Sequence, residues 1–260
     1  MLSKRFITSA ILGGMLTVCA LAANAGVMLG GTRVILGEND RQASISLKNT
    51  DTSPYVVQTW IDAGEGKNKT PLLVTPPLAR LDPGAENILR IVRIAGDLPG
   101  DRESVFWLNV KEIPEKVDQP NVLQIAVRTR IKIFYRPAAL AGKSSEAFAL
   151  IKLSVVPGEG GSGAALRVSN PSAYSVTFPG FKINGGKEQT KAGMVPPFGT
   201  LDFPLSAISS PQAVDVSYTT LNDYGGETPE VVTKATVASA ATVLAPTAEQ
   251  AAPAVVGIPR

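Results

Sequence analysis

Apolar and polar residues alternate almost without a break over fifteen residues, from Asn121 to Tyr135. Successive side chains of a β-strand point to opposite faces, so this stretch has one aliphatic face and one polar, largely basic face. The aliphatic face holds Leu123, Ile125, Val127, Ile131, Ile133 and Tyr135, and the polar face holds Gln124, Arg128, Arg130 and Lys132. Such a strand would be about 50 Å long, whereas strands usually have roughly five or six residues. We therefore expect it to extend beyond its own sheet and to offer an unpaired edge that recruits another chain.

The rest of the chain from Gly26 onward shows shorter apolar runs, separated by turn residues every eight to twelve positions. This spacing is typical of an all-β sandwich. The predicted strands before the long one are 33–36, 43–47, 55–61, 87–94 and 105–113. Those after it are 149–156, 164–168, 175–178, 181–183, 200–204 and 213–219, with a further strand at 230–237 left open. No amphipathic helix longer than two or three turns is predicted.

The long strand ends at Arg136-Pro137, and because proline cannot continue a ladder we place a domain boundary there. The length that remains suits two sandwiches of about 100 residues each. We predict an N-terminal domain over 26–137 and a C-terminal domain over 138–237. Residues 238–260 are rich in alanine, proline and threonine and have little to bury, which predicts a disordered tail.

Residues 1–25 have the pattern of a secretory signal peptide. Lys4 and Arg5 form the positive start, 11–21 the apolar centre, and 23–25 (Ala-Asn-Ala) the cleavage site. A membrane anchor is the alternative, but the apolar run is short and contains glycine. A lipid-modified Cys19 is another alternative, which the bulky Val18 before it disfavours. We expect the mature chain to begin at Gly26 and to reside in a bacterial periplasm.

Composition excludes several classes of function. The chain has no histidine, and its single cysteine lies in the predicted signal. A Ser-His-Asp triad, a cysteine nucleophile and the usual zinc sites are therefore excluded from the mature chain. Removing Lys4 and Arg5 leaves 23 basic against 22 acidic residues, a near balance that does not predict nucleic-acid binding. We predict no catalytic residue, no metal and no cofactor, and hence a protein that is not an enzyme.

Five motifs occur in order along the chain, and together they resemble a known family. They are ARLDPG at 79–84, DRES at 101–104, NVKEIP at 109–114, NVLQIAVRTRIKIFYRP at 121–137 and NDYGG at 222–226. In these motifs the chain resembles the periplasmic pilus (fimbrial) chaperones of the chaperone–usher system, up to about Gly226 and more weakly in the second domain. In chaperone–pilin complexes one protein adds a strand to the incomplete sheet of the other, and members of this family have Ig-like sandwiches.

The resemblance implies two immunoglobulin-like β-sandwich domains in an L or boomerang arrangement. It implies partners as well, namely pilus subunits that lack their last strand and an outer-membrane usher. Leu123, Ile125 and Val127 would be the donor-strand side chains that enter the subunit's open groove. Arg33 and Lys132 would anchor the subunit's C-terminal carboxylate. The sequence leaves open whether the free chaperone self-associates, which subunits it serves, and whether Thr75-Pro76 or Pro76-Pro77 is cis.

A structural role is implied for three further residues: Glu103, Arg136 and Asp223 match a salt-bridged link between the two domains. For the basic face, an ordinary solvated surface is the simplest interpretation of Arg128 and Arg130, with Arg130 as a second-line subunit contact. We expect Trp60 and Trp107 to fill the first core.

Periodicity alone would allow Leu123, Ile125 and Val127 to belong to the domain's own core. Two other classes of function also compete with the chaperone. An Ig-like pilus subunit would be a single incomplete domain with an N-terminal extension of alternating residues, whereas this chain has two predicted domains and a long internal strand. A sugar-binding module or carbohydrate-active enzyme on a β-sandwich would need paired carboxylates on facing strands or an aromatic platform, and neither is evident. We therefore predict a non-enzymatic chaperone that binds, folds and caps fimbrial subunits by donor-strand complementation and delivers them to the usher.

Overall fold

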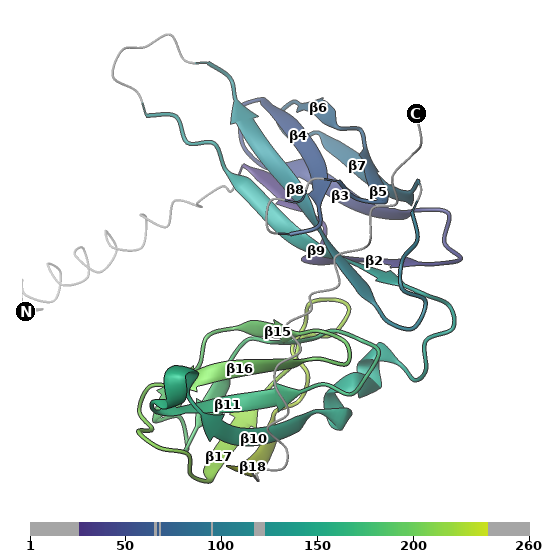
Figure 1. Ribbon diagram of the computed structural model, residues 1–260. Helices are drawn as coiled ribbons and strands as arrows, with labels where there is room; N and C mark the ends of the chain where they lie inside the picture. Colours follow the sequence, from purple (N-terminus) through teal and green to yellow (C-terminus); the bar gives the residue numbers. More distant parts are fainter. Residues whose placement is uncertain (1–25, 65–66, 68, 95, 117–122, 239–260) are drawn as a thin grey trace, which may run out of the picture.

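The computed structural model describes residues 26–64, 67, 69–94, 96–116 and 123–238. The predicted signal peptide, the first two residues of the predicted long strand, and all of the predicted tail but Ala238 lie outside these residues. The described chain forms two β units joined at the end of strand β9, and the two units are inclined to one another (Figure 1). The all-β prediction is confirmed.

Two sheets form the first unit. One has the strand order β1-β3-β7-β5, with bounds Val27–Leu29, Ala43–Asn49, Glu86–Arg93 and Leu72–Thr75. The other has the order β2-β9-β8-β4-β6, with bounds Arg33–Gly37, Arg128–Arg136, Ser104–Pro114, Tyr55–Asp62 and Leu78–Leu81. Alternate residues of both sheets face a shared core that includes Leu47, Leu89, Leu108 and Ile133, each with 0% of its surface exposed. The peptide bond between Thr75 and Pro76 is cis.

A larger curved sheet and a two-stranded ribbon form the second unit. The larger sheet has the order β14-β13-β17-β18-β10-β11-β16, with bounds Glu188–Gln189, Phe181–Ile183, Val214–Tyr218, Val231–Val237, Lys152–Pro157, Ala164–Ser169 and Thr200–Leu205. The ribbon pairs β12 (Val176–Phe178) with β15 (Gly193–Val195). The core of this unit contains several aromatic rings, and those of Phe178 and Phe181 are stacked with 4.7 Å between their centroids. Two short 3₁₀ helices, η1 (Ser144–Leu150) and η2 (Glu159–Gly161), complete the fold.

Several predicted strands need correction. Strand β10 begins at Lys152, because η1 occupies the residues before it. Strands β1, β5, β6, β14 and β15 were not predicted, and each has four residues or fewer. Such short strands show too few alternations to stand out from loop sequence.

The long strand differs most from its prediction. Strand β9 covers only Arg128–Arg136, and residues 123–127 form no strand. Pairing with β8 ends at Lys111 opposite Arg128, followed by one more hydrogen bond of 2.8 Å from Glu112 N to Val127 O. Beyond that point no strand of the described residues pairs with residues 123–126, so the described chain does not complete a ladder along the predicted extension.

The tryptophan prediction is wrong. Trp60 and Trp107 do not belong to the buried core, but lie partly exposed on the outer face of β4 and β8. The reason is the register of the sheet: Thr59, Ile61, Phe106 and Leu108 take the inward positions, which leaves the tryptophans outward.

Candidate functional site

An exposed row of aliphatic side chains precedes β9. Leu123 has 85% of its surface exposed, Ile125 70% and Val127 47%. These residues share sequence parity with Ile131 and Ile133, which are buried in the first core. The exposed row is therefore the continuation of a core-facing row past the end of its own domain. Isolated exposed aliphatic side chains are common in proteins, but three at alternate positions of one segment form a surface suited to another chain.

Two cationic side chains lie side by side on the paired strands β2 and β9. Arg33 on β2 and Lys132 on β9 are direct partners in the parallel register of these strands. The Arg33 guanidinium lies over the Phe134 ring at 5.7 Å, and its Nη1 donates a hydrogen bond of 3.3 Å to the carbonyl of Leu221 in the second unit. The structure thus brings the two predicted anchor residues together at the junction of the two units.

This pair is not neutralised by a direct carboxylate contact. The Nε of Arg33 is buried and has no hydrogen-bond partner, and Lys132 forms no ion pair with any residue that the structure describes. Burial, followed by the charge of Arg33, lowers the pKa of the Lys132 ammonium. Burial also lowers the pKa of Arg33, although the nearby carboxylates of Asp223 and Glu103 oppose this. A bound carboxylate would relieve the repulsion and satisfy the unpaired donors, so the pair is suited to an anion.

A charge cluster joins the two units. Arg136 Nε lies 2.7 Å from Glu103 Oε1, and its Nη1 and Nη2 each donate a hydrogen bond of 2.6 Å to the carboxylate of Asp223. Glu103 also accepts a hydrogen bond of 2.9 Å from the backbone of Ser175, and Ser144 Oγ donates one of 2.9 Å to Asp223. The three residues expected to link the domains are thus in direct contact.

The cluster shifts the pKa of each of its members. Burial would lower the pKa of Arg136, but hydrogen bonds to Asp223 and the charge of Glu103 outweigh burial and raise that pKa. The hydrogen bonds from Arg136 lower the pKa of Asp223. Burial raises the pKa of Glu103, and the charge of Arg136 opposes this only in part. The guanidinium therefore remains charged and holds both carboxyl groups at the junction.

The loop that carries Asp223 is closely fitted to the first unit. Asn222 Oδ1 accepts hydrogen bonds from the backbone of Tyr224 and Gly226, at 2.9 and 3.1 Å. Gly225 has φ +83° and lies against Thr32, where an added Cβ would be 2.1 Å from Thr32 Oγ1. Only glycine satisfies both the backbone angle and this close approach.

Sequence reasoning missed a second group of polar residues near the anchor pair. Arg128 and Arg130 are exposed, as expected, and both also lie within 4.0 Å of the carboxylate of Asp62, at 3.7 and 2.6 Å. Asn109 connects them, accepting from Arg128 and donating to Asp62. The outward positions of Trp60, Asp62, Trp107 and Asn109 follow from strand alternation, once the inward residues are known.

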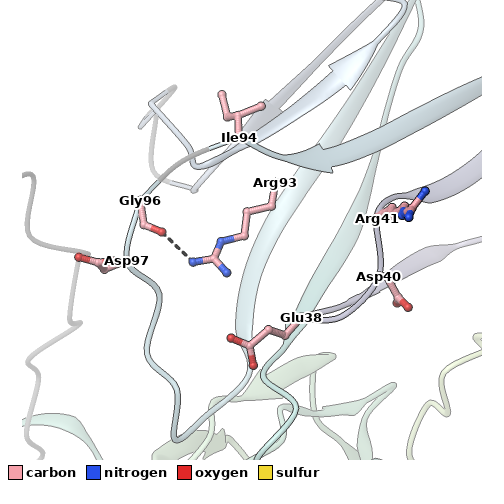
Figure 2. A pocket seen from close by; sticks show the side chains of 7 residues that line it. All are labelled: Glu38, Asp40, Arg41, Arg93, Ile94, Gly96 and Asp97. Atoms are coloured by element: carbon pink, nitrogen blue, oxygen red, sulfur yellow. Dashed lines mark hydrogen bonds between the residues drawn. The ribbon is translucent and has the colours of Figure 1, made fainter.

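One open pocket, of about 550 Å³, lies elsewhere in the first unit (Figure 2). Its lining residues are Glu38, Asp40, Arg41, Arg93, Ile94, Gly96 and Asp97. Arg93 is engaged by Tyr135 Oη at 2.8 Å and the Gly96 carbonyl at 3.0 Å. The described residues contain no group of three or more metal-binding side chains. No helix in the described part of the chain is long and apolar enough to span a membrane.

The chain is similar to known proteins over most of its length. Residues 26–141 match the model of the PapD N-terminal domain, described as a pili and flagellar-assembly chaperone. Residues 146–232 match that of the pili assembly chaperone PapD, C-terminal domain. The probable fimbrial chaperone LpfB of Escherichia coli O157:H7 is 46% identical over 213 residues, covering 80% of this chain and 88% of LpfB.

Solved structures give the same picture. The crystal structure of YadV chaperone is 32% identical, with a TM-score of 0.68, and the match covers 82% of this chain and 100% of that one. The SafB chaperone from Salmonella enterica, solved in complex with the SafA pilin, is 28% identical with a TM-score of 0.69, covering 80% of this chain and 95% of the other. These likenesses confirm the prediction of two immunoglobulin-like β domains.

Proposed function

Because the chain belongs to the family of PapD-like pilus-assembly chaperones, we propose that it is a periplasmic chaperone for fimbrial subunits. It binds, folds and caps these subunits by donor-strand complementation and delivers them to an outer-membrane usher. The observation that carries the mechanism is the exposed aliphatic row of Leu123, Ile125 and Val127, which continues the core-facing row of β9. The matches to both chaperone domains favour this role over that of a pilus structural subunit.

Capture begins with the backbone of residues 123–127. Among the described residues this segment has no neighbouring strand, so its N–H and C=O groups, apart from the Val127 carbonyl that accepts from Glu112, are available to an incomplete sheet. Pairing with the subunit would extend β9 to the length that the alternation of the sequence indicates. Main-chain hydrogen bonds do not depend on side-chain identity, so one chaperone can serve several related subunits.

The exposed aliphatic side chains then fill the subunit's groove. Leu123, Ile125 and Val127 would each contribute about 1.5–3 kcal/mol on full burial, before the entropic costs of association. Arg33 and Lys132 would bind the C-terminal carboxylate of the subunit through charge-assisted hydrogen bonds, each worth about 1.5–3 kcal/mol. Fixing one end of the subunit strand sets its register, because a slip by one residue would turn the aliphatic row out of the groove.

Other assignments complete the proposal. Residues 26–137 and 138–237 are the two functional domains, and Glu103, Arg136 and Asp223 hold them at a fixed angle. Fimbrial chaperones of this family are periplasmic, and the signal peptide of this chain directs its export to the periplasm and is removed by cleavage after Ala25. The family role is that of a chaperone, which requires no catalysis, so we assign no reaction and no cofactor to the chain.

Co-expression in the periplasm with a fimbrial subunit tests the proposal. The subunit should be recovered as a soluble binary complex with the chaperone, and should aggregate or be degraded without it. A matched subunit whose groove is filled by its own fused donor strand should be soluble alone and should not bind. Equal binding of the open and the filled subunit would contradict donor-strand complementation.

A further inference from the structure

A layer of tryptophan and arginine side chains covers the outer face of β4, β8 and β9. We call it the Trp–Arg face, and it consists of Trp60, Trp107, Arg128 and Arg130, with Asp62 and Asn109 between them. Its position is set by the sheet register, in which Trp107 pairs directly with Lys132 and Asn109 with Arg130. The Trp–Arg face therefore begins at the anchor pair and continues along the same side of the sheet, past the first residues of β9.

Each arginine guanidinium lies over an indole ring. The guanidinium of Arg128 lies 5.0 Å from the centroid of Trp60, and that of Arg130 lies 4.5 Å from the centroid of Trp107. Hydrogen bonds fix the other side of each guanidinium: Arg130 Nη2 donates to Asp62 Oδ1 at 2.6 Å, and Arg128 Nη2 donates to Asn109 Oδ1 at 2.6 Å. The two arginines are thus ordered by contacts within the chaperone itself.

The Asp62 carboxylate is the centre of this arrangement. It is 4% exposed and also accepts hydrogen bonds from Asn109 Nδ2 at 2.7 Å and from the backbone of Gly64 at 2.8 Å. Both carboxylate oxygens of Asp62 already accept hydrogen bonds from groups of the chain, so Asp62 itself is not placed to bind a partner. Its role toward a ligand is to position the arginines above it.

The arginines themselves still face solvent. The side chains of Arg128 and Arg130 are 51% and 39% exposed. The Nη1 atoms of both, and the Nε of Arg130, have no hydrogen-bond partner among the residues that the structure describes. Together with the neighbouring Arg33 and Lys132 they make four cations, against which the face itself contributes the one carboxylate of Asp62. The surplus positive charge and free N–H donors suit carboxylate groups.

We propose that the Trp–Arg face is a second docking surface for the fimbrial subunit, which contacts acidic side chains on the subunit's folded body. This inference rests on the proposed function, since the subunit bound by residues 123–127 and by the anchor pair lies next to this face. Three features favour a binding role: continuity with the anchor pair, charge complementarity, and prior ordering of the side chains. Arginine and tryptophan are enriched among residues that dominate binding energy, and pre-ordered side chains lose less entropy on association.

The tryptophans provide a direct readout, because the chain has two and both lie on this face. The chaperone is labelled with 5-fluorotryptophan, and its two ¹⁹F resonances are followed on addition of unlabelled fimbrial subunit. We expect both resonances to shift on binding and to be protected from a soluble gadolinium chelate. A complex that forms while both resonances keep their position and their sensitivity to the chelate would overturn the proposal.

A pair of substitutions measures the contribution of the arginines. Arg128→Gln with Arg130→Gln should raise the dissociation constant for the subunit about tenfold or more and should flatten its dependence on salt. The matched control is Arg41→Gln with Arg90→Gln, which removes two exposed arginines from elsewhere in the same domain. It should change the dissociation constant less than about twofold.

Two further measurements distinguish a direct binding role of the two arginines from a purely structural one. Thermal unfolding of each variant shows whether weaker binding reflects loss of the fold, and Arg128→Lys with Arg130→Lys keeps the charge while removing the planar donors. If the wild-type chaperone binds no subunit, the proposed function itself fails. If it binds, and the folded glutamine variant binds equally well with the same salt dependence, the Trp–Arg face is only a structural feature and this inference fails.

Discussion

Arg136 and Asp223, 87 residues apart in the sequence, form a two-point contact in which both terminal guanidinium nitrogens lie 2.6 Å from carboxylate oxygens. Arg136 is the last residue of β9, the strand whose other end leads into the exposed aliphatic row. The same strand therefore connects the domain junction, the proposed anchor residue Lys132 and residues 123–127. A change at the junction should alter where the two proposed subunit contacts lie relative to the second domain.

Arg136→Ala should destabilise the protein by about 3–5 kcal/mol, because it leaves the carboxylate of Glu103, with its side chain 1% exposed, without its cation. Denaturant unfolding measures the loss. Arg80→Ala serves as the control, since both partners of its ion pair with Asp82 are 65% exposed and the pair should add little to stability. Equal losses for the two variants would show that the junction cluster adds no stability.

Alternation of residues predicted most of the long strands of this fold, because the inward positions of strands such as β4 and β8 are mostly apolar. It failed for Trp60 and Trp107, because a large aromatic residue outside the core has the same hydrophobicity as one inside it. The register of β4 and β8 places these rings outward, and there they contact Arg128 and Arg130 of β9, a long-range pairing that no local pattern contains.

The candidate site, like the fold, could be predicted from the sequence only in part. The exposed aliphatic row follows from alternation combined with unusual strand length, both visible in the sequence. Strand length was nevertheless overestimated, because alternation indicates only that the segment can pair, and the described residues contain no strand that pairs with it. Arg33 and Lys132 lie almost 100 residues apart, so their adjacency depends on the parallel pairing of β2 with β9, which only the family resemblance indicated in advance.

Ile125→Asp should abolish or strongly weaken subunit capture and leave the chaperone folded. The Ile125 side chain is 70% exposed in the free protein, so a carboxylate there remains solvated, whereas in the subunit's groove it would be buried without a partner. Binding by calorimetry and far-UV circular dichroism provide the measurements. Ile133→Asp is the matched control at a position of the same parity that is 0% exposed, and it should unfold the first domain. Unfolding by Ile125→Asp would instead place that side chain in the chaperone's own core.

Substituting both Arg33 and Lys132 by alanine should prevent stable subunit capture, because the terminal carboxylate loses both of its cations. The fold should remain, since Lys132 forms no ion pair within the described chain and Arg33 contributes one long hydrogen bond to the Leu221 carbonyl. Arg41→Ala with Lys187→Ala removes the same charges from exposed positions and should bind normally. Normal pulldown of the subunit by the Arg33/Lys132 variant would show that the carboxylate is held elsewhere.

Affinity for the subunit should fall on the alkaline side earlier than an ordinary lysine would allow. Burial and the charge of Arg33 lower the pKa of Lys132 in the free chaperone, whereas a bound carboxylate favours the ammonium and raises that pKa. Binding is therefore strongest below the free pKa of Lys132 and weakens as the pH rises through it, by at most about tenfold per pH unit for one proton. Dissociation constants measured between pH 7 and 10.5, with circular dichroism at each pH, test this. Lys132→Arg keeps its charge over the whole range, so its affinity should not show the decline, and identical alkaline profiles for both proteins would assign the titration to another group.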